Sequence, residues 1–253
     1  MGRGPRTHDP VRHTDVTVLP RSPEMRRLYP DPAESVSVAD AYADSSRAAH
    51  DGRPWVYLVM IASTDGATAV DGVSGPLGSA GDKAVFSTLR ANADMVLVGA
   101  ATARAEKYGP PKRADLRIAV VSRALEIDWD SALMRSDQVL IVTTETAGPV
   151  PDHIPTIRTG EQDVDLAAAL TELHRRGANV VMAEGGPSIN GQLIAQDLVD
   201  ELALTLSPAL VAGTSARVAH GPRTAFEKLS LVHVLEEDGA LFLRYRTQAS
   251  GSR

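Results

Sequence analysis

The residues best suited to chemistry lie in one stretch, 180–191, which reads VVMAEGGPSING. It begins with three apolar residues in a row, a pattern typical of a strand that is covered on both faces. Gly185 and Gly186 then permit a tight turn without a Cβ, and Pro187 suits a first helical position. The free N–H groups and the dipole of such a helix start favour an anion. The stretch therefore predicts a phosphate site, although Gly-Gly also occurs where packing alone requires it.

A carboxylate stands at the mouth of this predicted anion site. Glu184 directly precedes the glycine pair, and its charge would repel a phosphate unless it points at another group. A ribose hydroxyl, a backbone donor or a reacting ring could be that group. Glu184 is therefore a candidate for substrate binding and for catalysis.

Composition limits the classes of protein to which the chain can belong. Its 253 residues are 43% hydrophobic, enough for one substantial core and an extension. The formal charge of −6 disfavours nucleic acid and anionic membranes as partners. The chain has no cysteine, and its seven histidines lack the i, i+4 spacing of a helical metal pair. We therefore expect a cytoplasmic protein that binds a small molecule and no metal, nucleic acid or membrane.

Strands and helices that could hold these residues alternate along the chain. Apolar runs predict strands at 55–62, 95–98, 117–121, 139–142, 154–157, 180–182 and 201–206. Spacing and caps predict helices at 82–92 (capped by Asp82), 100–105, 163–176 and from Pro187 onward. Two last runs, 231–236 and 240–245, flank a turn and predict an antiparallel hairpin. This order predicts an α/β fold with a mixed, mostly parallel central sheet and helices on both faces.

The chain changes in character near residue 53. Residues 1–53 contain Arg but no Lys, and we expect them to form a partly disordered N-terminal extension, disordered over 1 to about 15. Its weakly apolar part, 16–42, should pack along the body without a core of its own. We expect the folded domain to span 54–247 and a disordered tail to span 248–253.

Common nucleotide and nucleophile motifs are missing. Neither G-x-G-x-x-G nor G-x-x-x-x-G-K-[ST] occurs. The nearest approach to a nucleophile elbow, GVSGP at 72–76, has Pro in place of its last Gly.

Three segments resemble the reductase domain of bifunctional riboflavin-biosynthesis enzymes, a family whose fold resembles dihydrofolate reductase. They are VMIASTDG at 59–66, ADMVLVGAATAR at 93–104 and AEGGPSINGQLIAQDLVDELALTLSPALVAG at 183–213. The resemblance spans residues 55–247 and implies a dihydrofolate-reductase-like three-layer fold. It also implies a homodimer that pairs through the apolar stretch 199–211. The zinc deaminase usually joined to this domain has no counterpart here, since its cysteines are missing, so the resemblance indicates a stand-alone reductase.

The resemblance implies NADPH as the cofactor. Ser122 and Arg123 follow a strand and would hold the adenosine 2′-phosphate, since a guanidinium binds phosphate through two bonds and a hydroxyl adds another. A solvated loop charge is the alternative for Arg123. The residues that would contact the pyrophosphate are Gly99, Ala100, Thr102, Gly185, Gly186, Pro187 and Ser188.

The resemblance also implies a set of substrate contacts. Ser63 and Asp65 belong to an S-x-D-G turn at the end of the first strand, and Arg90 matches an arginine that grips the substrate phosphate. Glu184 matches an acidic residue that faces the substrate. Asp65 or Glu184, or a water between them, would supply a proton. The alternatives are an ordinary turn pair for Asp65 and an exposed helix charge for Arg90.

Two departures from the family pattern lie on the substrate side. Val59 stands where the family usually has Lys, and EKYGP at 106–110 replaces an Asp-Asn-Pro stretch. The expected reaction is hydride transfer to C1′ of 5-amino-6-ribosylaminouracil 5′-phosphate, which gives the ribitylamino product. The departures keep two alternatives open: reduction of dihydrofolate or another pterin, and nucleotide binding without turnover.

Overall fold

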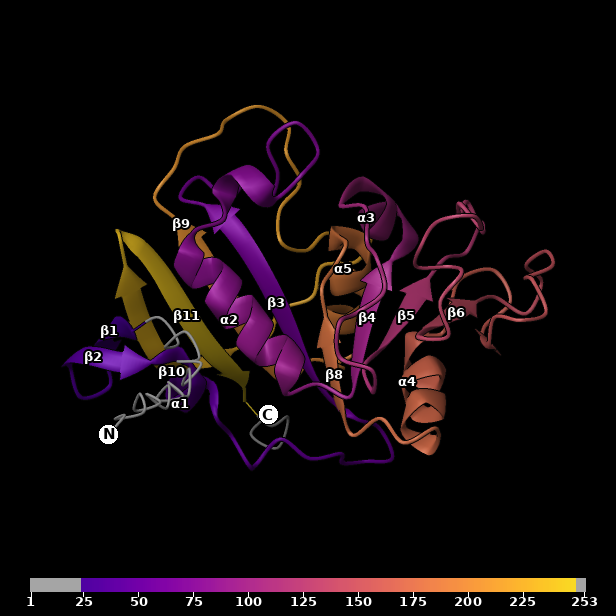
Figure 1. Ribbon diagram of the computed structural model, residues 1–253, viewed down its shortest axis with the longest axis horizontal. Helices are drawn as coiled ribbons and strands as arrows, with labels where there is room; N and C mark the ends of the chain where they lie inside the picture. Colours follow the sequence, from indigo (N-terminus) through magenta and orange to yellow (C-terminus); the bar gives the residue numbers. More distant parts are fainter. Residues whose placement is uncertain (1–23, 249–253) are drawn as a thin grey trace, which may run out of the picture.

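A computed structural model describes residues 24–248 of the chain (Figure 1). Its strands are β1 (Glu24–Tyr29), β2 (Ala33–Ser37), β3 (Trp55–Ser63), β4 (Met95–Gly99), β5 (Arg117–Val121), β6 (Val139–Thr143), β7 (Thr156–Arg158), β8 (Val180–Ala183), β9 (Glu201–Ser207), β10 (Leu229–Glu237) and β11 (Ala240–Thr247). Its helices are α1 (Val38–Tyr42), α2 (Ala80–Ala91), α3 (Ala100–Ala105), α4 (Leu166–Arg175) and α5 (Pro187–Ala195), with a 3-10 turn at Gly75–Leu77. None of the helices within residues 24–248 is long and apolar enough to cross a membrane.

All the described strands form one mixed sheet. Their order is β2-β1-β10-β11-β9-β3-β8-β4-β5-β6-β7. The pairs from β9 to β7 are parallel, and those from β2 to β9 are antiparallel. The mostly parallel sheet and the C-terminal antiparallel hairpin, β10–β11, are thus confirmed.

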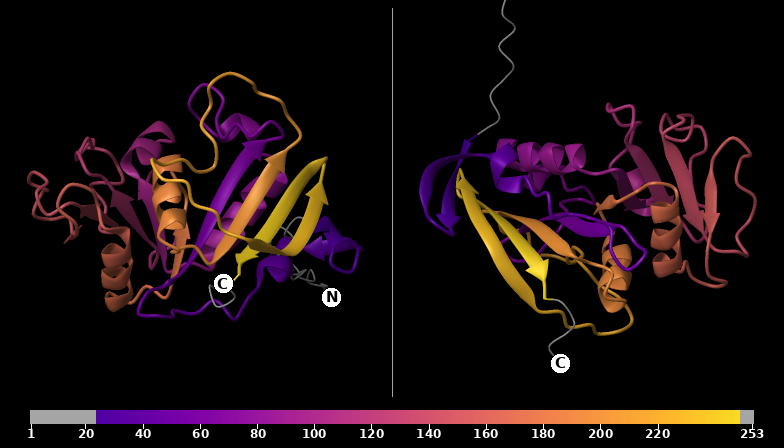
Figure 2. Two further views of the ribbon diagram at one scale, coloured as in Figure 1. Left: turned by 180° about the vertical axis from the view of Figure 1, so that it is seen from behind. Right: turned by 90° about the horizontal axis from the view of Figure 1, so that it is seen from below.

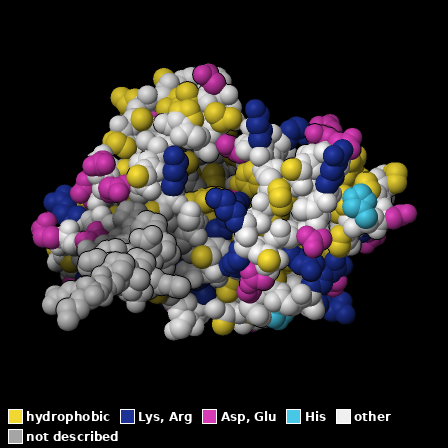
Figure 3. Space-filling view, in the orientation of Figure 1, with side chains coloured by type: hydrophobic (Ala, Val, Ile, Leu, Met, Phe, Trp, Pro, Cys, Tyr) yellow, Lys and Arg dark blue, Asp and Glu magenta, His cyan; other side chains and the backbone are white. Residues whose placement is uncertain are grey.

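Helices cover both faces of the sheet, as predicted (Figure 2). On one face, α1, α2 and α3 contribute Tyr42, Leu89 and Ala103 to a core that includes Tyr57 of β3. On the other face, α4 and α5 pack onto a second core that includes Leu58 of β3. Successive residues of a strand point to opposite faces, so β3 supplies both cores. Acidic and basic side chains are interspersed over the visible face, among apolar ones (Figure 3).

Two predicted helix starts are wrong by a few residues. Helix α2 starts at Ala80, and Ser79 rather than Asp82 is its cap, because the Ser79 hydroxyl accepts a hydrogen bond from the Asp82 backbone N–H at 3.0 Å. Helix α4 starts at Leu166 and is capped by Asp165. Both Ser and Asp side chains can cap a helix. A sequence pattern therefore predicts that a helix is present more reliably than it predicts its first residue.

Part of the segment before residue 54, namely β1 and β2, belongs to the sheet. Strand β1 pairs with β10 of the C-terminal hairpin, and β2 pairs with β1. Met25 and Tyr42 are buried in the core beside α2. The Arg47 guanidinium binds the buried Glu201 carboxylate at 2.6 Å and so ties this segment to β9. The fold therefore starts earlier than the predicted boundary at residue 53. The stretch predicted to be disordered, 1 to about 15, lies outside the described residues, as does most of the predicted tail.

Candidate active site

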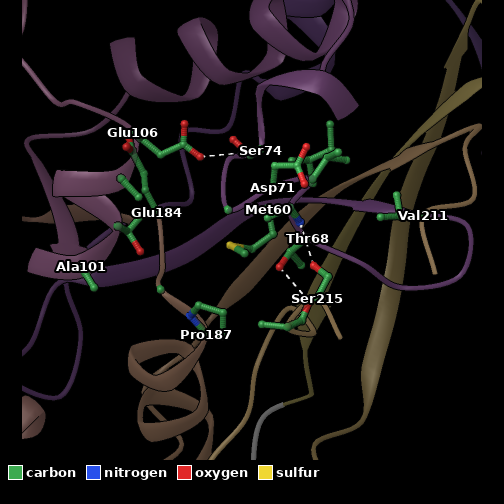
Figure 4. Close-up of a pocket in the computed structure, with 18 of the residues that line it drawn as sticks. Met60, Thr68, Asp71, Ser74, Ala101, Glu106, Glu184, Pro187, Val211 and Ser215 are labelled. Carbon is green, nitrogen blue, oxygen red and sulfur yellow. Dashed lines mark hydrogen bonds between the residues drawn. The ribbon is translucent and has the colours of Figure 1, made fainter. Parts of the chain in front are cut away.

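The carboxyl ends of the central parallel strands and their following loops enclose a cavity of about 820 Å³. In open parallel sheets this edge is where ligands bind. Glu184, Glu106 and Ala101 lie toward one end, and Thr68, Ser215 and Val211 toward the other (Figure 4). The lining comes from β3 (59–61), the loop 68–74, Asp82 and Phe86 of α2, the segment 101–108, Glu184 with 186–187, and the loop 211–216.

Two helix starts meet at one end of this cavity. Gly99 precedes α3 and Gly186 precedes α5, and neither helix has a side-chain cap. The Gly99 N–H donates to the Gly185 carbonyl at 2.8 Å, so the two loops touch. A Cβ on Gly186 would lie 2.8 Å from Thr102 Oγ1. The first N–H groups of both helices have no partner within the helix, and this end of the cavity is therefore suited to an anion.

The backbone conformation explains why position 185 is a glycine. Its φ is +92°, a region that side chains other than glycine rarely adopt. Gly186 has an ordinary φ of −72°, and the group that a Cβ there would meet is the Thr102 hydroxyl. Pro187 is the first residue of α5, as predicted. The structure thus brings together the predicted pyrophosphate residues of 99–102 and 185–188.

Ser122 and Arg123 lie just past the carboxyl end of β5, the neighbour of β4. Ser122 is buried, whereas the Arg123 side chain is 67% exposed. Arg123 Nη1 forms an ion pair with the Asp163 carboxylate at 2.8 Å. Neither residue lines the cavity, and the 2′-phosphate role stays a prediction.

The two predicted substrate residues Arg90 and Glu184 bind each other. Arg90 Nε donates to Glu184 Oε1 at 2.9 Å, and Nη2 donates to Oε2 at 2.7 Å. The Tyr108 hydroxyl donates to the same Oε2 at 2.5 Å. Phe86 packs under the guanidinium, whose central carbon is 4.8 Å from the ring centre. Arg90 is therefore neither an exposed helix charge nor free to bind a phosphate in this state.

Burial and pairing act against each other at Glu184. Burial raises the pKa of the Glu184 carboxyl, while Arg90 and Tyr108 lower it, and burial dominates. The pKa of Tyr108 is raised well above its ordinary value, by burial first and then by the Glu184 charge. Tyr108 therefore stays protonated and acts as a hydrogen-bond donor.

Ser63 and Asp65 lie together, but Asp65 holds the loop 211–212. The Ser63 hydroxyl donates to Asp65 at 2.5 Å, and the Ala212 N–H donates to Asp65 at 2.7 Å. These bonds lower the pKa of Asp65 to about 2, the Ser63 bond contributing most. Asp65 is therefore ionised at neutral pH, and it does not line the cavity. This geometry weighs against its predicted role as a proton donor and favours a role in anchoring the loop 211–212.

Three cavity residues were not predicted from the sequence. Tyr108 and Glu106 fall in the segment noted only as a departure, where Glu106 accepts a hydrogen bond from the Ser74 N–H at 2.7 Å. Asp82 lines the cavity although it was expected only to cap a helix. The sequence did contain a signal for Asp82: it precedes Phe86 by four residues and Arg90 by eight, which places all three on one face of a helix. Val59 also lines the cavity, where the family usually has Lys.

Two helix starts suited to an anion, a buried carboxylate and a cavity at the strand ends together describe an α/β protein with a site suited to an anionic organic ligand. The chain belongs to the RibD C-terminal domain family, whose model matches residues 54–240. This membership confirms the resemblance inferred from the three motifs.

Named relatives and a solved structure are consistent with this membership. The chain is 30% identical over 202 residues to the 2,5-diamino-6-ribosylamino-4(3H)-pyrimidinone 5′-phosphate reductase of Aquifex aeolicus, covering 72% of this chain and 89% of that protein. Identity to the reductase of the same name from Archaeoglobus fulgidus is 26% over 184 residues, or 64% and 83% of the two chains. The structure of a pyrimidine reductase-like protein from Corynebacterium diphtheriae superposes with a TM-score of 0.70 at 26% identity, covering 78% of this chain and 93% of that one.

Proposed function

We propose that the chain is an NADPH-dependent oxidoreductase of riboflavin biosynthesis that reduces a ribosylaminopyrimidine 5′-phosphate to its ribitylamino product. The observation that carries this proposal is the pairing of an anion-binding end, at 99–102 and 185–188, with the Glu184–Arg90–Tyr108 cluster in one cavity. The family and its named reductases support the same reaction.

The glycine loops fit the pyrophosphate of a dinucleotide. A Cβ on Gly186 would meet Thr102, so the glycine keeps this concavity open to a phosphate. Arg123 is exposed and free to turn from Asp163 toward a 2′-phosphate. When bound there, the cofactor supplies a hydride from its nicotinamide.

Glu184 is proposed to contact the pyrimidine, with Arg90 and Tyr108 as positioning residues. Two donors from Arg90 and one from Tyr108 fix the carboxylate in a single orientation. A fixed carboxylate can accept hydrogen bonds from the amino and ring N–H groups of a pyrimidine. This arrangement aligns the substrate, which is most of what hydride transfer requires of a protein.

Two substrates fit this proposal. The resemblance to the bifunctional enzymes favours 5-amino-6-ribosylaminouracil 5′-phosphate, whereas the stand-alone relatives are named for the 2,5-diaminopyrimidinone. The two compounds differ at C2 of the ring, which carries an oxo group in one and an amino group in the other. The named relatives favour the diamino compound as the better substrate.

The test is a steady-state assay of NADPH oxidation with both pyrimidines and with dihydrofolate, the ribitylamino product being identified by mass. We expect turnover of both pyrimidines, a higher kcat/KM for the diamino compound, and none of dihydrofolate. Turnover of dihydrofolate alone would replace the proposal with a pterin reductase. Tight NADPH binding without turnover of any substrate would leave a nucleotide-binding protein.

We also propose a homodimer, formed through an apolar face of β9 and β11. Three cross-strand pairs form this face: Leu202 with Tyr245, Leu204 with Leu243 and Leu206 with Leu241. Each side chain is half-buried, and no helix of the described residues covers this part of the sheet (Figure 2). An uncovered apolar ladder of this kind suits a second copy of the chain.

Light scattering at micromolar concentration tests the dimer. The wild type should have the mass of two chains, and Leu204→Asp should have the mass of one. Leu28→Asp is the matched control, because Leu28 is 38% exposed and lies on β1, outside both this face and the stretch 199–211. A monomeric wild type would contradict the proposal.

A further inference from the structure

We infer that Asp82 is the acid that protonates the substrate nitrogen during reduction, a role that rests on the proposed function. The assignment follows from its place in the cavity and from the partners that occupy the other carboxylates.

One face of α2 runs along the cavity. Asp82, Phe86 and Arg90 are four residues apart, so they share a face of the helix. Asp82 and Phe86 line the cavity, and Arg90 holds Glu184 at its end. Asp82 is thus carried on a regular helix, and the same helix positions the residue proposed to orient the pyrimidine.

The other carboxylates of the cavity are already engaged or lie in the open. The Glu184 oxygens accept hydrogen bonds from Arg90 and Tyr108, and Glu106 accepts one from the Ser74 N–H. Burial raises the pKa of the Glu184 carboxyl, but its oxygens are occupied by these donors and its proposed role is to accept hydrogen bonds from the pyrimidine. Asp71 lies in an exposed turn. Asp82 is the cavity carboxyl that is half-buried and has no arginine or backbone N–H donor among its described hydrogen bonds.

The surroundings of Asp82 favour its neutral form. Burial raises the pKa of its carboxyl, and the Thr205 hydroxyl and the Lys83 charge lower it less. Tyr42 of α1 also interacts with Asp82 and is neutral, because burial raises the pKa of Tyr42 as well. On β10, Glu237 packs against the adjacent Gly81, where a Cβ would collide with its carboxylate. The start of α2 favours a carboxylate, but such effects are modest.

The proton balances the reaction. Ring opening of the ribosylamine gives a C=N bond between C1′ and the exocyclic nitrogen. Hydride addition at C1′ forms a C–H bond, breaks the C=N π bond and leaves its electron pair on nitrogen. The Asp82 O–H bond then breaks as the N–H bond forms. Asp82 becomes a carboxylate, and a proton from solvent restores its acid form before the next turnover.

The first test compares Asp82→Asn with Asp152→Asn, which makes the same change at an exposed carboxylate outside the cavity. Asp82→Asn should lower kcat about 100-fold, the usual scale for loss of a general acid, with KM changed less than about threefold. Asp82→Glu should restore activity to within about tenfold. Asp152→Asn should keep the wild-type kcat.

Two outcomes of this assay bear on different claims. If the wild type forms product and Asp82→Asn retains its kcat, the role of Asp82 is overturned and the proposed reaction stands. If the wild type forms no product, both fall together.

A second readout needs no substrate or cofactor. An acid with a raised pKa in the folded state binds more protons there than in the unfolded state, so it lowers stability as pH rises. Thermal unfolding between about pH 4 and pH 8 should therefore show Asp82→Asn gaining Tm over the wild type as pH rises. Asp152→Asn should show no such trend. A pH-independent difference for Asp82→Asn would mean that Asp82 is an ordinary carboxylate and would overturn the assignment.

Discussion

The two ends of the cavity are built from different parts of the chain. The end proposed to bind the cofactor consists of backbone: two helix starts and glycines at 99 and 185–186. The end proposed to bind the substrate consists of side chains that hold one another, with Arg90 and Tyr108 on Glu184. A backbone site needs glycine at particular positions and so leaves a motif in the sequence. A site made of side chains can be assembled from residues far apart in the sequence, and it then leaves no such motif.

The largest expected effect is at the cofactor end. Gly186→Val should abolish NADPH binding, weakening it more than about 100-fold, because its Cβ would meet Thr102 Oγ1 and its methyl groups would fill the anion site. Titration calorimetry measures the loss, and circular dichroism checks the fold.

Gly148→Val is the matched control, because a Cβ at Gly148 meets nothing within 4 Å. A folded Gly186→Val protein that binds NADPH as tightly as the wild type would move the anion site elsewhere.

The next effect is at the substrate end. Arg90→Ala should lower the free energy of unfolding by about 3 kcal/mol, because it leaves the buried Glu184 carboxylate without its charge partner. The double variant Arg90→Ala/Glu184→Gln should recover part of this loss in urea unfolding. NADPH affinity should change little in either variant. Equal losses in the single and double variants would argue that the ion pair adds nothing beyond packing.

The smallest effect concerns the choice of cofactor. Arg123→Ala should weaken NADPH binding about tenfold and leave NADH binding nearly unchanged, because Arg123 is solvated and already paired with Asp163. Asp163→Asn frees Arg123 and should strengthen NADPH binding slightly. Equal losses for both cofactors in Arg123→Ala would remove Arg123 from the 2′-phosphate site.

The same contrast between backbone and side-chain sites explains which features could be predicted from the sequence. The strand at 180–183 and the Gly-Gly-Pro start of α5 depend on local backbone rules, and both were predicted. The bond between Arg90 and Glu184 joins residues 94 positions apart, and no local pattern encodes it. Asp65 was predicted to contact the substrate because its S-x-D-G turn resembles that of the family, yet its carboxylate is bound by the distant loop 211–212.

The N-terminal segment gives a similar lesson. Apolar and polar residues alternate only weakly over 24–37. These residues form strands because β1 pairs with the edge of β10, which lies near the other end of the chain. Local pattern alone therefore undervalued them. Met25 is buried only because α2 and the C-terminal hairpin close over it.

The central claim is that a ribosylaminopyrimidine bound in this cavity is reduced at C1′. The most direct test uses NADPH carrying deuterium at C4 of the nicotinamide, with the product examined by NMR. We predict one deuterium at C1′ of the ribityl chain, formed by the wild type and lost with Gly186→Val. Deuterium on a ring carbon, or a product without deuterium, would contradict the claim.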